Sequence, residues 1–563
     1  MVKWNLEPGT WNPEPETWNP EPGTRNLEPG TNYIIFVFLI LPSMKRLFTA
    51  LLLFAAVSAF SQHANILIST SNSPNEPSII INPKNTNELF AGSNIDNYYY
   101  STDGGYSWVE GILYSAQNGV WGDPVLLCDT AGAFYFFHLS NPPEGNWIDR
   151  IVCQKTNGPG QEWNDGTYMG LNGTKAQDKH WAAVDWKNNN IYVTWTQFDQ
   201  YGTSDPTYFS NIMFSKSTDG GMSWSPAVQI NEVSGDCIDS DNTTEGAVPA
   251  VGPNGEIYVA WAGPAGLVFD RSLDQGETWL EDDIFISDIG GGWDYAIPGI
   301  YRANGLPVTV CDTSGGPFNG NIYVNWTDQR NGFNDTDVWL AKSTDGGNTW
   351  SDPIRVNDDP PARQQFFTWM AIDQTNGYLY FVFYDRRNYS AQSTSTDVYM
   401  ARSTDGGETF TNFLVSEEPF TPNSGVFFGD YTNLTAHDNV IRPIWARLEM
   451  YQLSLYTAII DTAMVGTEEW TGYTPFSAEN SYPNPFREST WISFKLHEQA
   501  PVSLVVYDQL GRPVETLLEK ELLQPGKYSY QFNSQGKSLA AGVYYFSLVS
   551  NDRVVRQKII LNR

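Results

Sequence analysis

The octapeptide STDGGYSW (residues 101–108) recurs four more times along the chain. The other copies are STDGGMSW at 217–224, SLDQGETW at 272–279, STDGGNTW at 343–350 and STDGGETF at 403–410. Their aspartates are 116, 55, 71 and 60 residues apart, so the first interval is about twice the others. A degenerate copy, KTNGPGQEW at 155–163, divides that long interval. Self-similarity at a period of tens of residues is typical of a repeat fold.

Each copy, here called a box, has the composition of a tight hairpin turn. Glycine after the aspartate supplies a positive φ, and the aspartate carboxylate can accept hydrogen bonds from amides of the same turn. The closing aromatic residue can cover the base of the hairpin. The boxes resemble the Asp-box (BNR) repeats of sialidase-like β-propellers over most of residues 63–462. The resemblance implies a structural role for the box aspartates, which are Asp103, Asp219, Asp274, Asp345 and Asp405.

Paired apolar segments recur between the boxes and predict β-strands. The clearest examples are IYVTW at 191–195, IYVAW at 257–261 and IYVNW at 322–326, and looser versions bring the number of units to seven. The last unit has only three predicted strands. The segment NILIS at 65–69 would supply its fourth strand and close the ring without an exposed edge. We therefore predict an all-β fold at 62–462, a seven-bladed β-propeller, with the six blades of the sialidases as the alternative.

The C-terminal residues 481–563 have a different character. Alternating strands between Gly and Pro turns predict a small Ig-like β-sandwich, joined to the propeller by a linker at 463–480. Motifs such as SYPNPF at 481–486 and AGVYY at 541–545 resemble the type A C-terminal sorting domain of type IX secretion. That resemblance implies recognition by the type IX machinery and release or anchoring at the outer surface of a Gram-negative bacterium. A carbohydrate-binding sandwich is the alternative.

The N-terminal segment contains two distinct patterns. Residues 4–31 are four Pro- and Glu-rich heptapeptides, for which we expect disorder. A basic start at Met44, an apolar run and small residues predict a signal peptide at 44–61. Because a signal peptide should begin at a start codon, our hypothesis is that residues 1–43 are an upstream artefact. The apolar run is too short for an ordinary transmembrane span.

The composition limits the partners of the chain. A formal charge of −32 and a pI of about 4.4 argue against nucleic acid and anionic membranes. Five histidines and four cysteines give no zinc signature. We expect no essential disulfide framework and no cofactor. We also expect the protein to be a monomer. The loop that carries Asp236, Asp239, Asp241 and Glu245 could bind Ca²⁺. Because its spacing is not that of an EF-hand, a solvated loop is the alternative.

In a propeller, ligands normally enter at the mouth of the central channel, on the face opposite the boxes. A ring of carboxylates is predicted there, just before the innermost strands, and it could bind a cation or polarise a hydroxyl. The alternative is that each carboxylate caps backbone amides where its strand begins. The ring consists of Glu76, Asp123, Asp178, Glu245 and Asp430.

Other candidates lie on loops of the same face. Two Asp-x-Arg sequences could bind a carboxylate ligand through an arginine fork, and a link between neighbouring blades is the other interpretation. Aromatic loop residues could stack on sugar rings. These further candidates are Asp328, Arg330, Asp385, Arg387, Trp293, Tyr301 and Arg302, with Trp147 as an additional loop aromatic.

The resemblance does not transfer a catalytic site. Sialidases use three arginines, a Tyr–Glu nucleophile pair and an Asp, and the first arginine lies at the inner strand of the first blade. Here that stretch reads Asn75-Glu76-Pro77-Ser78, without an arginine. We expect a secreted or surface-anchored propeller that binds or processes extracellular glycans or glycoproteins. The alternatives are an active exo-sialidase or other glycoside hydrolase, and a protein-interaction or adhesion scaffold.

Overall fold

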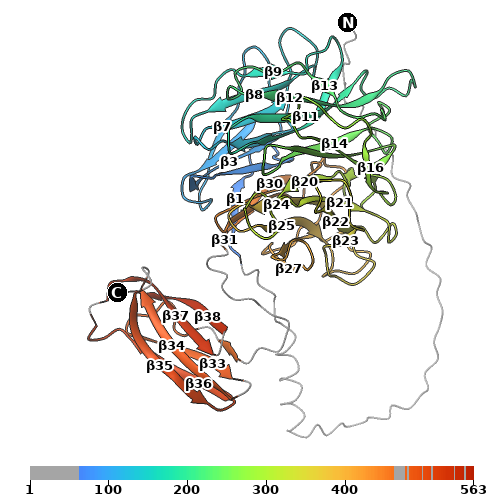
Figure 1. Cartoon of the computed structure of the whole chain (residues 1–563). Coiled ribbons are helices and arrows are strands. Elements are labelled where there is room, and N and C mark those ends of the chain that lie inside the picture. The colour runs from blue at the N-terminus through green and yellow to red at the C-terminus, as the bar shows by residue number, and fades with distance from the viewer. Residues whose placement is uncertain are drawn as a thin grey trace, which may run out of the picture. The chain divides into compact units, whose positions relative to one another are not determined.

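The computed structural model describes residues 63–461, 476–478, 481–496, 499–508, 512–537, 539–550 and 553–562. Its regular structure is entirely β (Figure 1). Among these residues there is no helix of the length and apolarity needed to cross a bilayer. The predicted signal peptide and the heptapeptides lie outside the described residues, as does most of the predicted linker.

Residues 63–461 form seven antiparallel sheets that follow one another along the chain. The first three are β2 (Ser78–Asn82), β3 (Asn85–Ser93), β4 (Asn97–Ser101) and β5 (Val109–Ile112); β6 (Val125–Cys128), β7 (Phe134–Leu139), β8 (Ile151–Thr156) and β9 (Thr167–Met169); β10 (Ala176–Val184), β11 (Ile191–Phe198), β12 (Ser210–Ser217) and β13 (Val228–Gln229). The next three are β14 (Glu245–Val251), β15 (Ile257–Gly263), β16 (Gly266–Ser272) and β17 (Ile284–Ser287); β20 (Val308–Cys311), β21 (Ile322–Asp328), β22 (Asp337–Ser343) and β23 (Ile354–Arg355); β24 (Gln365–Asp373), β25 (Tyr378–Asp385), β26 (Asp397–Ser403) and β27 (Thr411–Leu414). A two-stranded ribbon, β18 (Asp294–Tyr295) and β19 (Ala303–Asn304), lies between the fourth and fifth sheets in the sequence.

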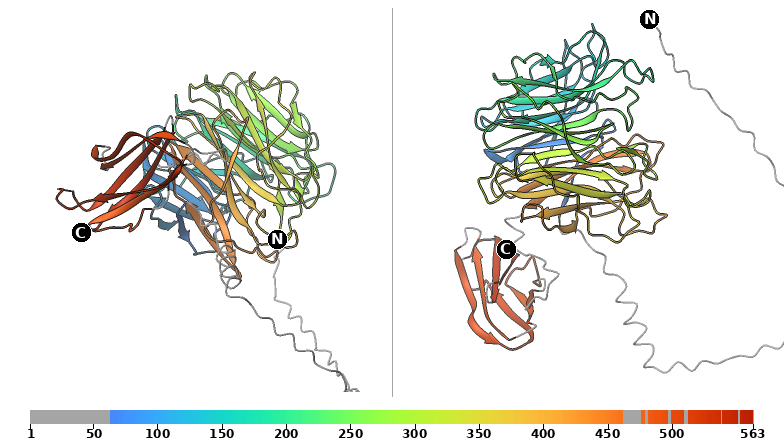
Figure 2. Two further views of the ribbon diagram at one scale, coloured as in Figure 1. Left: turned by 90° about the horizontal axis from the view of Figure 1, so that it is seen from below. Right: turned by 45° about the vertical axis from the view of Figure 1, so that its right-hand side comes forward.

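The seventh sheet joins the two ends of this region. It contains β28 (Asn433–His437), β29 (Val440–Glu449), β30 (Gln452–Ala458) and β31 (Ile460–Asp461), and β1 (Asn65–Ser69) pairs with β30. Asn65 lies opposite Ala458, as the prediction of an N-terminal closing strand requires. The first strands of successive sheets contact one another, and β28 contacts β2, so the sheets form a closed ring (Figure 2). This is the architecture of a β-propeller.

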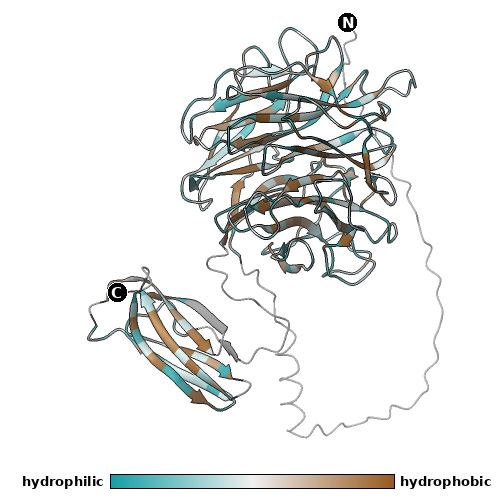
Figure 3. Ribbon diagram, in the orientation of Figure 1, coloured by the Kyte–Doolittle hydropathy of each residue, from teal (hydrophilic) through white to brown (hydrophobic). Residues whose placement is uncertain are grey.

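Hydrophobic residues concentrate on the strands and hydrophilic residues on the loops (Figure 3). The second strands carry a tryptophan at the same place in four of the sheets, and all four are fully buried: Trp195, Trp261, Trp326 and Trp445. Large rings at these positions fill the space between neighbouring sheets, because a propeller buries both faces of every sheet except at its rim.

The box turns connect the third and fourth strands of a sheet. In the first box, Ser107 N and Ser107 Oγ donate to the Asp103 carboxylate at 2.9 and 2.6 Å, and Gly105 N donates to Ser101 Oγ at 2.8 Å. Gly104 and Gly105 have φ of 76° and 93°, as the turn prediction requires. The same serine–aspartate–glycine pattern recurs at Asp219, Asp274, Asp345 and Asp405.

A cation from the preceding sheet binds each of these turns. Lys155 Nζ donates to Gly220 O at 3.4 Å, Lys216 Nζ to Gln275 O at 2.8 Å and Lys342 Nζ to Gly406 O at 3.2 Å. Arg271 contacts the carbonyl of Gly346 in the same way. The first box receives Arg442 Nε of β29, at 2.7 Å from Gly104 O. Neighbouring sheets are therefore linked at the box end of the ring.

The C-terminal residues form two further sheets that share one hydrophobic core. The strands are β32 (Phe476–Ala478), β33 (Ser489–Leu496) and β36 (Gly526–Asn533), and β34 (Ala500–Asp508), β35 (Pro513–Leu523), β37 (Gly542–Ser550) and β38 (Arg553–Leu561). β32 lies in the stretch predicted as a linker, but it pairs with β33 and so extends this region toward the N-terminus.

Candidate functional site

The five predicted ring carboxylates all lie at the end of the channel opposite the boxes, where the innermost strands begin. Glu76 and Asp123 precede β2 and β6, Asp178 and Glu245 lie at the start of β10 and β14, and Asp430 precedes β28. The structure adds three residues that the ring prediction did not include. We call the eight residues the charge cluster: Glu76, Asp123, Asp178, Lys179, Asp239, Glu245, Arg302 and Asp430.

Asp430 is the anion that both cations of the cluster bind. Lys179 Nζ lies 2.8 Å from Asp430 Oδ2 and 3.5 Å from Asp123 Oδ2. Arg302 Nε donates to Asp430 Oδ1 at 2.7 Å, and a second guanidinium nitrogen contacts Oδ2. Burial opposes ionisation of Asp430, but the attraction of Lys179 and Arg302 is larger and lowers its pKa. Asp430 is therefore a carboxylate in the folded protein.

Three other carboxyl groups of the cluster have raised pKa values. Burial is the main cause for Glu76, followed by repulsion from Asp123 and Asp430. Burial raises the pKa of Glu245, and the Asp239 charge adds to the effect. Burial also raises the pKa of Asp178 to about 7, against the attraction of Lys179. Six carboxyl groups face two cations here, so some of the acids retain their protons at neutral pH.

The backbone is strained where it enters the cluster. Glu76, Asp123 and Lys179 have positive φ, at 50°, 53° and 46°. Non-glycine residues adopt this conformation at a cost of about 1 kcal/mol each. Phe367, in the corresponding bulge of β24, has φ of 51°. The strain lies at the mouth of the channel, and strain of this kind gathers at binding and catalytic sites.

Aromatic and charged side chains from six loops continue from the cluster across the same face. Trp121 and Trp147 have ring centroids 6.1 Å apart, and Trp147 and Tyr201 5.9 Å apart. Tyr201 OH donates to Asp239 Oδ2 at 2.7 Å. We call the full series the aromatic arc: Trp121, Trp147, Tyr201, Asp239, Arg302, Phe427 and Tyr301.

The second half of the arc runs through the arginine. Arg302 lies 3.6 Å from the Asp239 carboxylate and stacks over the Phe427 ring at 5.2 Å. Phe427 in turn contacts Tyr301, at 6.0 Å between centroids. Tyr301, Trp147 and Trp121 are 61%, 45% and 39% exposed, so their rings are available to a ligand.

Trp293, predicted to stack on a sugar, is buried instead. It is 5% exposed and its indole nitrogen donates to Thr243 O at 3.2 Å, beneath the loop that carries Asp239. The prediction was wrong because a tryptophan in a long loop can as easily anchor the loop as present a ring to solvent.

Both Asp-x-Arg sequences form internal pairs rather than a free fork. Arg330 Nε donates to Asp328 at 2.9 Å, and Arg330 reaches Ser287 Oγ of the preceding sheet at 3.2 Å. Arg387 Nε donates to Asp385 at 2.8 Å, and its guanidinium also contacts Asp358, which follows β23 of the preceding sheet. These arginines link neighbouring sheets, which was the other interpretation of the pattern.

The carboxylates of the predicted Ca²⁺ loop contact protein donors. Asp236 Oδ1 accepts from Thr243 Oγ1 at 2.9 Å, and Asp241 Oδ1 accepts from Asp294 N at 2.8 Å. No group of three His, Cys, Asp or Glu side chains in the described part of the chain has the arrangement of a metal site.

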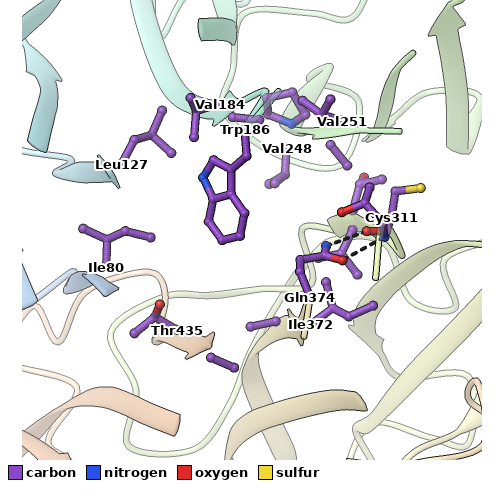
Figure 4. A pocket seen from close by; sticks show the side chains of 18 of the residues that line it. Ile80, Leu127, Val184, Trp186, Val248, Val251, Cys311, Ile372, Gln374 and Thr435 are labelled. Atoms are coloured by element: carbon purple, nitrogen blue, oxygen red, sulfur yellow. Dashed lines mark hydrogen bonds between the residues drawn. The ribbon is translucent and has the colours of Figure 1, made fainter. Parts of the chain in front are cut away.

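The channel itself holds an apolar cavity at the box end. Its volume is about 510 Å³, and side chains from all seven innermost strands line it (Figure 4). Trp186 points into this space, and its ring contacts His437 at 5.4 Å. Trp181 packs on Trp369 at 4.3 Å and on Tyr431 at 5.2 Å. Trp369 also lines the cavity, so these rings separate it from the charge cluster.

Sequence reasoning missed Lys179, Asp239 as a cluster member, and the arc residues Trp121, Tyr201 and Phe427. For Lys179 a signal was present, since it directly follows a predicted ring carboxylate. Lys179 and Asp430 are 251 residues apart, and only the closed ring brings them together.

Residues 480–562 match the family of secretion system C-terminal sorting domains. This domain indicates export by type IX secretion, to the cell surface or into the medium. None of the curated proteins matches the chain.

Several solved structures are similar to this chain at low sequence identity. The Hadza microbial sialidase Hz136 is 14% identical, with 67% of this chain and 74% of that chain covered and a TM-score of 0.38. A Trypanosoma rangeli sialidase in complex with the inhibitor DANA is 10% identical over 89% of each chain, with a TM-score of 0.38. An ulvan lyase of polysaccharide lyase family 25 is 12% identical, with 70% and 94% covered and a TM-score of 0.41.

Proposed function

We propose that this exported propeller binds extracellular glycans on the face opposite the boxes, through the aromatic arc. The observation that carries the proposal is the series of exposed rings that surrounds a charged centre on one face. Trp147 and Tyr301 are respectively 45% and 61% exposed, although large apolar rings are normally covered. Flat rings stack on the apolar faces of pyranoses, while carboxylates and a guanidinium bind sugar hydroxyls.

The state of the arginine disfavours a sialic acid or uronic acid as the main ligand. Recognition of a carboxylate needs a guanidinium with unused donors. Arg302 already makes a two-point contact with Asp430 and lies 3.6 Å from Asp239. An incoming carboxylate would have to displace the buried Asp430 anion, and the other ionised carboxylates of the charge cluster would repel the new charge. Neutral or cationic sugars meet no such barrier.

A glycan array that contains neutral, amino and anionic oligosaccharides tests the proposal with the full exported chain. Trp147→Ala and Tyr301→Ala are each expected to weaken binding about tenfold, because each removes one stacking surface. Tyr106→Ala is the matched control: Tyr106 is 53% exposed but lies in the first box, at the other end of the ring. Absence of binding across the array, or equal binding by all three variants, would refute the proposal.

Hydrolysis is the second candidate function, and the raised pKa of Glu245 favours it. Burial, with the Asp239 charge adding to it, raises the pKa of this acid, and a general acid for glycosidic cleavage needs a raised pKa. Fluorogenic neutral, amino, uronic and sialic glycosides would be assayed with the wild-type chain and Glu245→Gln. Turnover that Glu245→Gln abolishes would establish an enzyme, and no turnover by the wild-type chain would leave a binding protein.

A further inference from the structure

A small recess opens beside the arc, within the charge cluster. Its volume is about 30 Å³, and its lining includes Lys179, Asp239, Glu245, Asp294 and Arg302. Asp294 and Arg302 are exposed, so the recess reaches the surface. A space of this size accommodates one or two water molecules, or an ammonium group, which has about the volume of water. It is too small for a sugar ring, but it can hold one substituent of a ring that stacks on the arc.

Glu245 gives the recess its chemistry. The side chain is 1% exposed, and neither carboxyl oxygen receives a hydrogen bond from a donor among the described residues. Its charged neighbours are the carboxyl groups of Asp239 and Asp178 and the ammonium of Lys179, which is bound to Asp430. A buried acceptor without a donor is unfavourable, so Glu245, with Asp239 beside it, is placed to receive a donor.

The cations of the cluster do not fill this role. Lys179 Nζ lies 2.8 Å from Asp430, and Arg302 is held by the same carboxylate through Nε and approaches Asp239 Oδ2 only to 3.6 Å. Lys179 Nζ also lies 3.5 Å from Asp123 Oδ2, so two carboxylates already contact it. The recess therefore contains an excess of acceptors and no unused cation.

We infer that the recess binds a protonated primary amine, and that the glycan on the aromatic arc is one with a free amino group, such as a glucosamine residue. This inference rests on the proposed glycan binding at the arc. The ammonium N–H groups donate to the Glu245 and Asp239 carboxylates, and Glu245 releases its proton to solvent as the amine binds. Charge-assisted hydrogen bonds of this kind are about twice as strong as neutral ones.

The test compares two chitotetraoses, one fully N-acetylated and one with a single free amino group, by calorimetric titration of the full chain. The two ligands differ in one acetyl group, so stacking on the arc contributes equally to both. Binding of the amino ligand is expected to be about tenfold tighter at a pH where its amine is protonated. Glu245→Gln and Asp239→Asn are each expected to abolish this preference, and a thermal melt reports whether each variant is folded.

The net charge of −32 attracts cations even without a specific site, so a further variant controls for this nonspecific attraction. Glu110→Gln removes one exposed carboxylate from β5 and is expected to retain the tenfold preference. Equal affinity of wild-type protein for the two ligands would overturn the amine site and leave glycan binding standing. A preference that survives in both Glu245→Gln and Asp239→Asn would also overturn it. Absence of binding to both ligands would count against the glycan function itself.

Discussion

At the scale of single residues, Asp430 holds the charge cluster together. It is the shared anion for Lys179 and Arg302, and its side chain is 3% exposed. Removing one partner of a buried ion pair leaves an uncompensated buried charge. The loss of folding free energy is then far larger than the net stabilisation that the intact pair provides. The two cations of the cluster are therefore stably buried only when Asp430 is present.

Asp430→Asn is expected to lower the free energy of unfolding by about 3 kcal/mol, because it leaves two cations without their anion. Urea denaturation measures the change. Asp358→Asn is the matched control, since Asp358 also pairs with an arginine but is 60% exposed, and we expect it to change stability by less than about 1 kcal/mol. Similar losses in both variants would contradict the central role of Asp430.

Asp178 makes the stability of the folded protein depend on pH. Its pKa of about 7 in the folded protein lies above the value of about 3.9 in an unfolded chain. The unfolded chain therefore releases this proton first, and the contribution of Asp178 to stability falls as pH rises from about 4 to about 7. Asp178→Asn is expected to flatten the curve of unfolding free energy over this interval and to be the more stable protein at pH 7. Parallel curves for the two proteins would contradict the shift.

At the scale of elements, the box turn is more than a tight hairpin, because its carbonyl receives a cation from the sheet before it. Lys342 Nζ donates to Gly406 O at 3.2 Å and pairs with Glu408. We expect Lys342→Met to lower the free energy of unfolding by about 1 kcal/mol, since it keeps the aliphatic stem and loses the charged hydrogen bond. The exposed Lys84 supplies the control, and Lys84→Met should leave the urea midpoint unchanged.

The turns and strands were predictable from the sequence because their signals are local. A box needs only eight residues, and the apolar strand patterns lie beside it in the chain. The carboxylate ring was also predictable, since Glu76 and Asp430 occupy the same place relative to their inner strands. Side-chain direction within long loops was not predictable, and Trp293 shows why: its burial depends on Thr243, fifty residues away.

At the scale of the whole molecule, the ring depends on one short strand. β1 completes the seventh sheet, and Ile68 is 5% exposed in a core with Ile444 and Leu455 of β29 and β30. Ile68→Ala is expected to cost about 2–4 kcal/mol, measured by urea denaturation. Leu67, its neighbour in the same strand, is 48% exposed, so Leu67→Ala should cost less than about 0.5 kcal/mol. Equal effects of the two substitutions would mean that β1 does not hold the ring closed.

The pairing of β1 with β30 also has a consequence in time. Asn65 and Ala458 lie opposite each other, yet 393 residues separate them in the chain. A ribosome adds about 5–20 residues per second, so β1 emerges about 20–80 s before its partner exists. During that interval the apolar side of β1 has no sheet to join. The ring can therefore close only after translation has reached the seventh sheet.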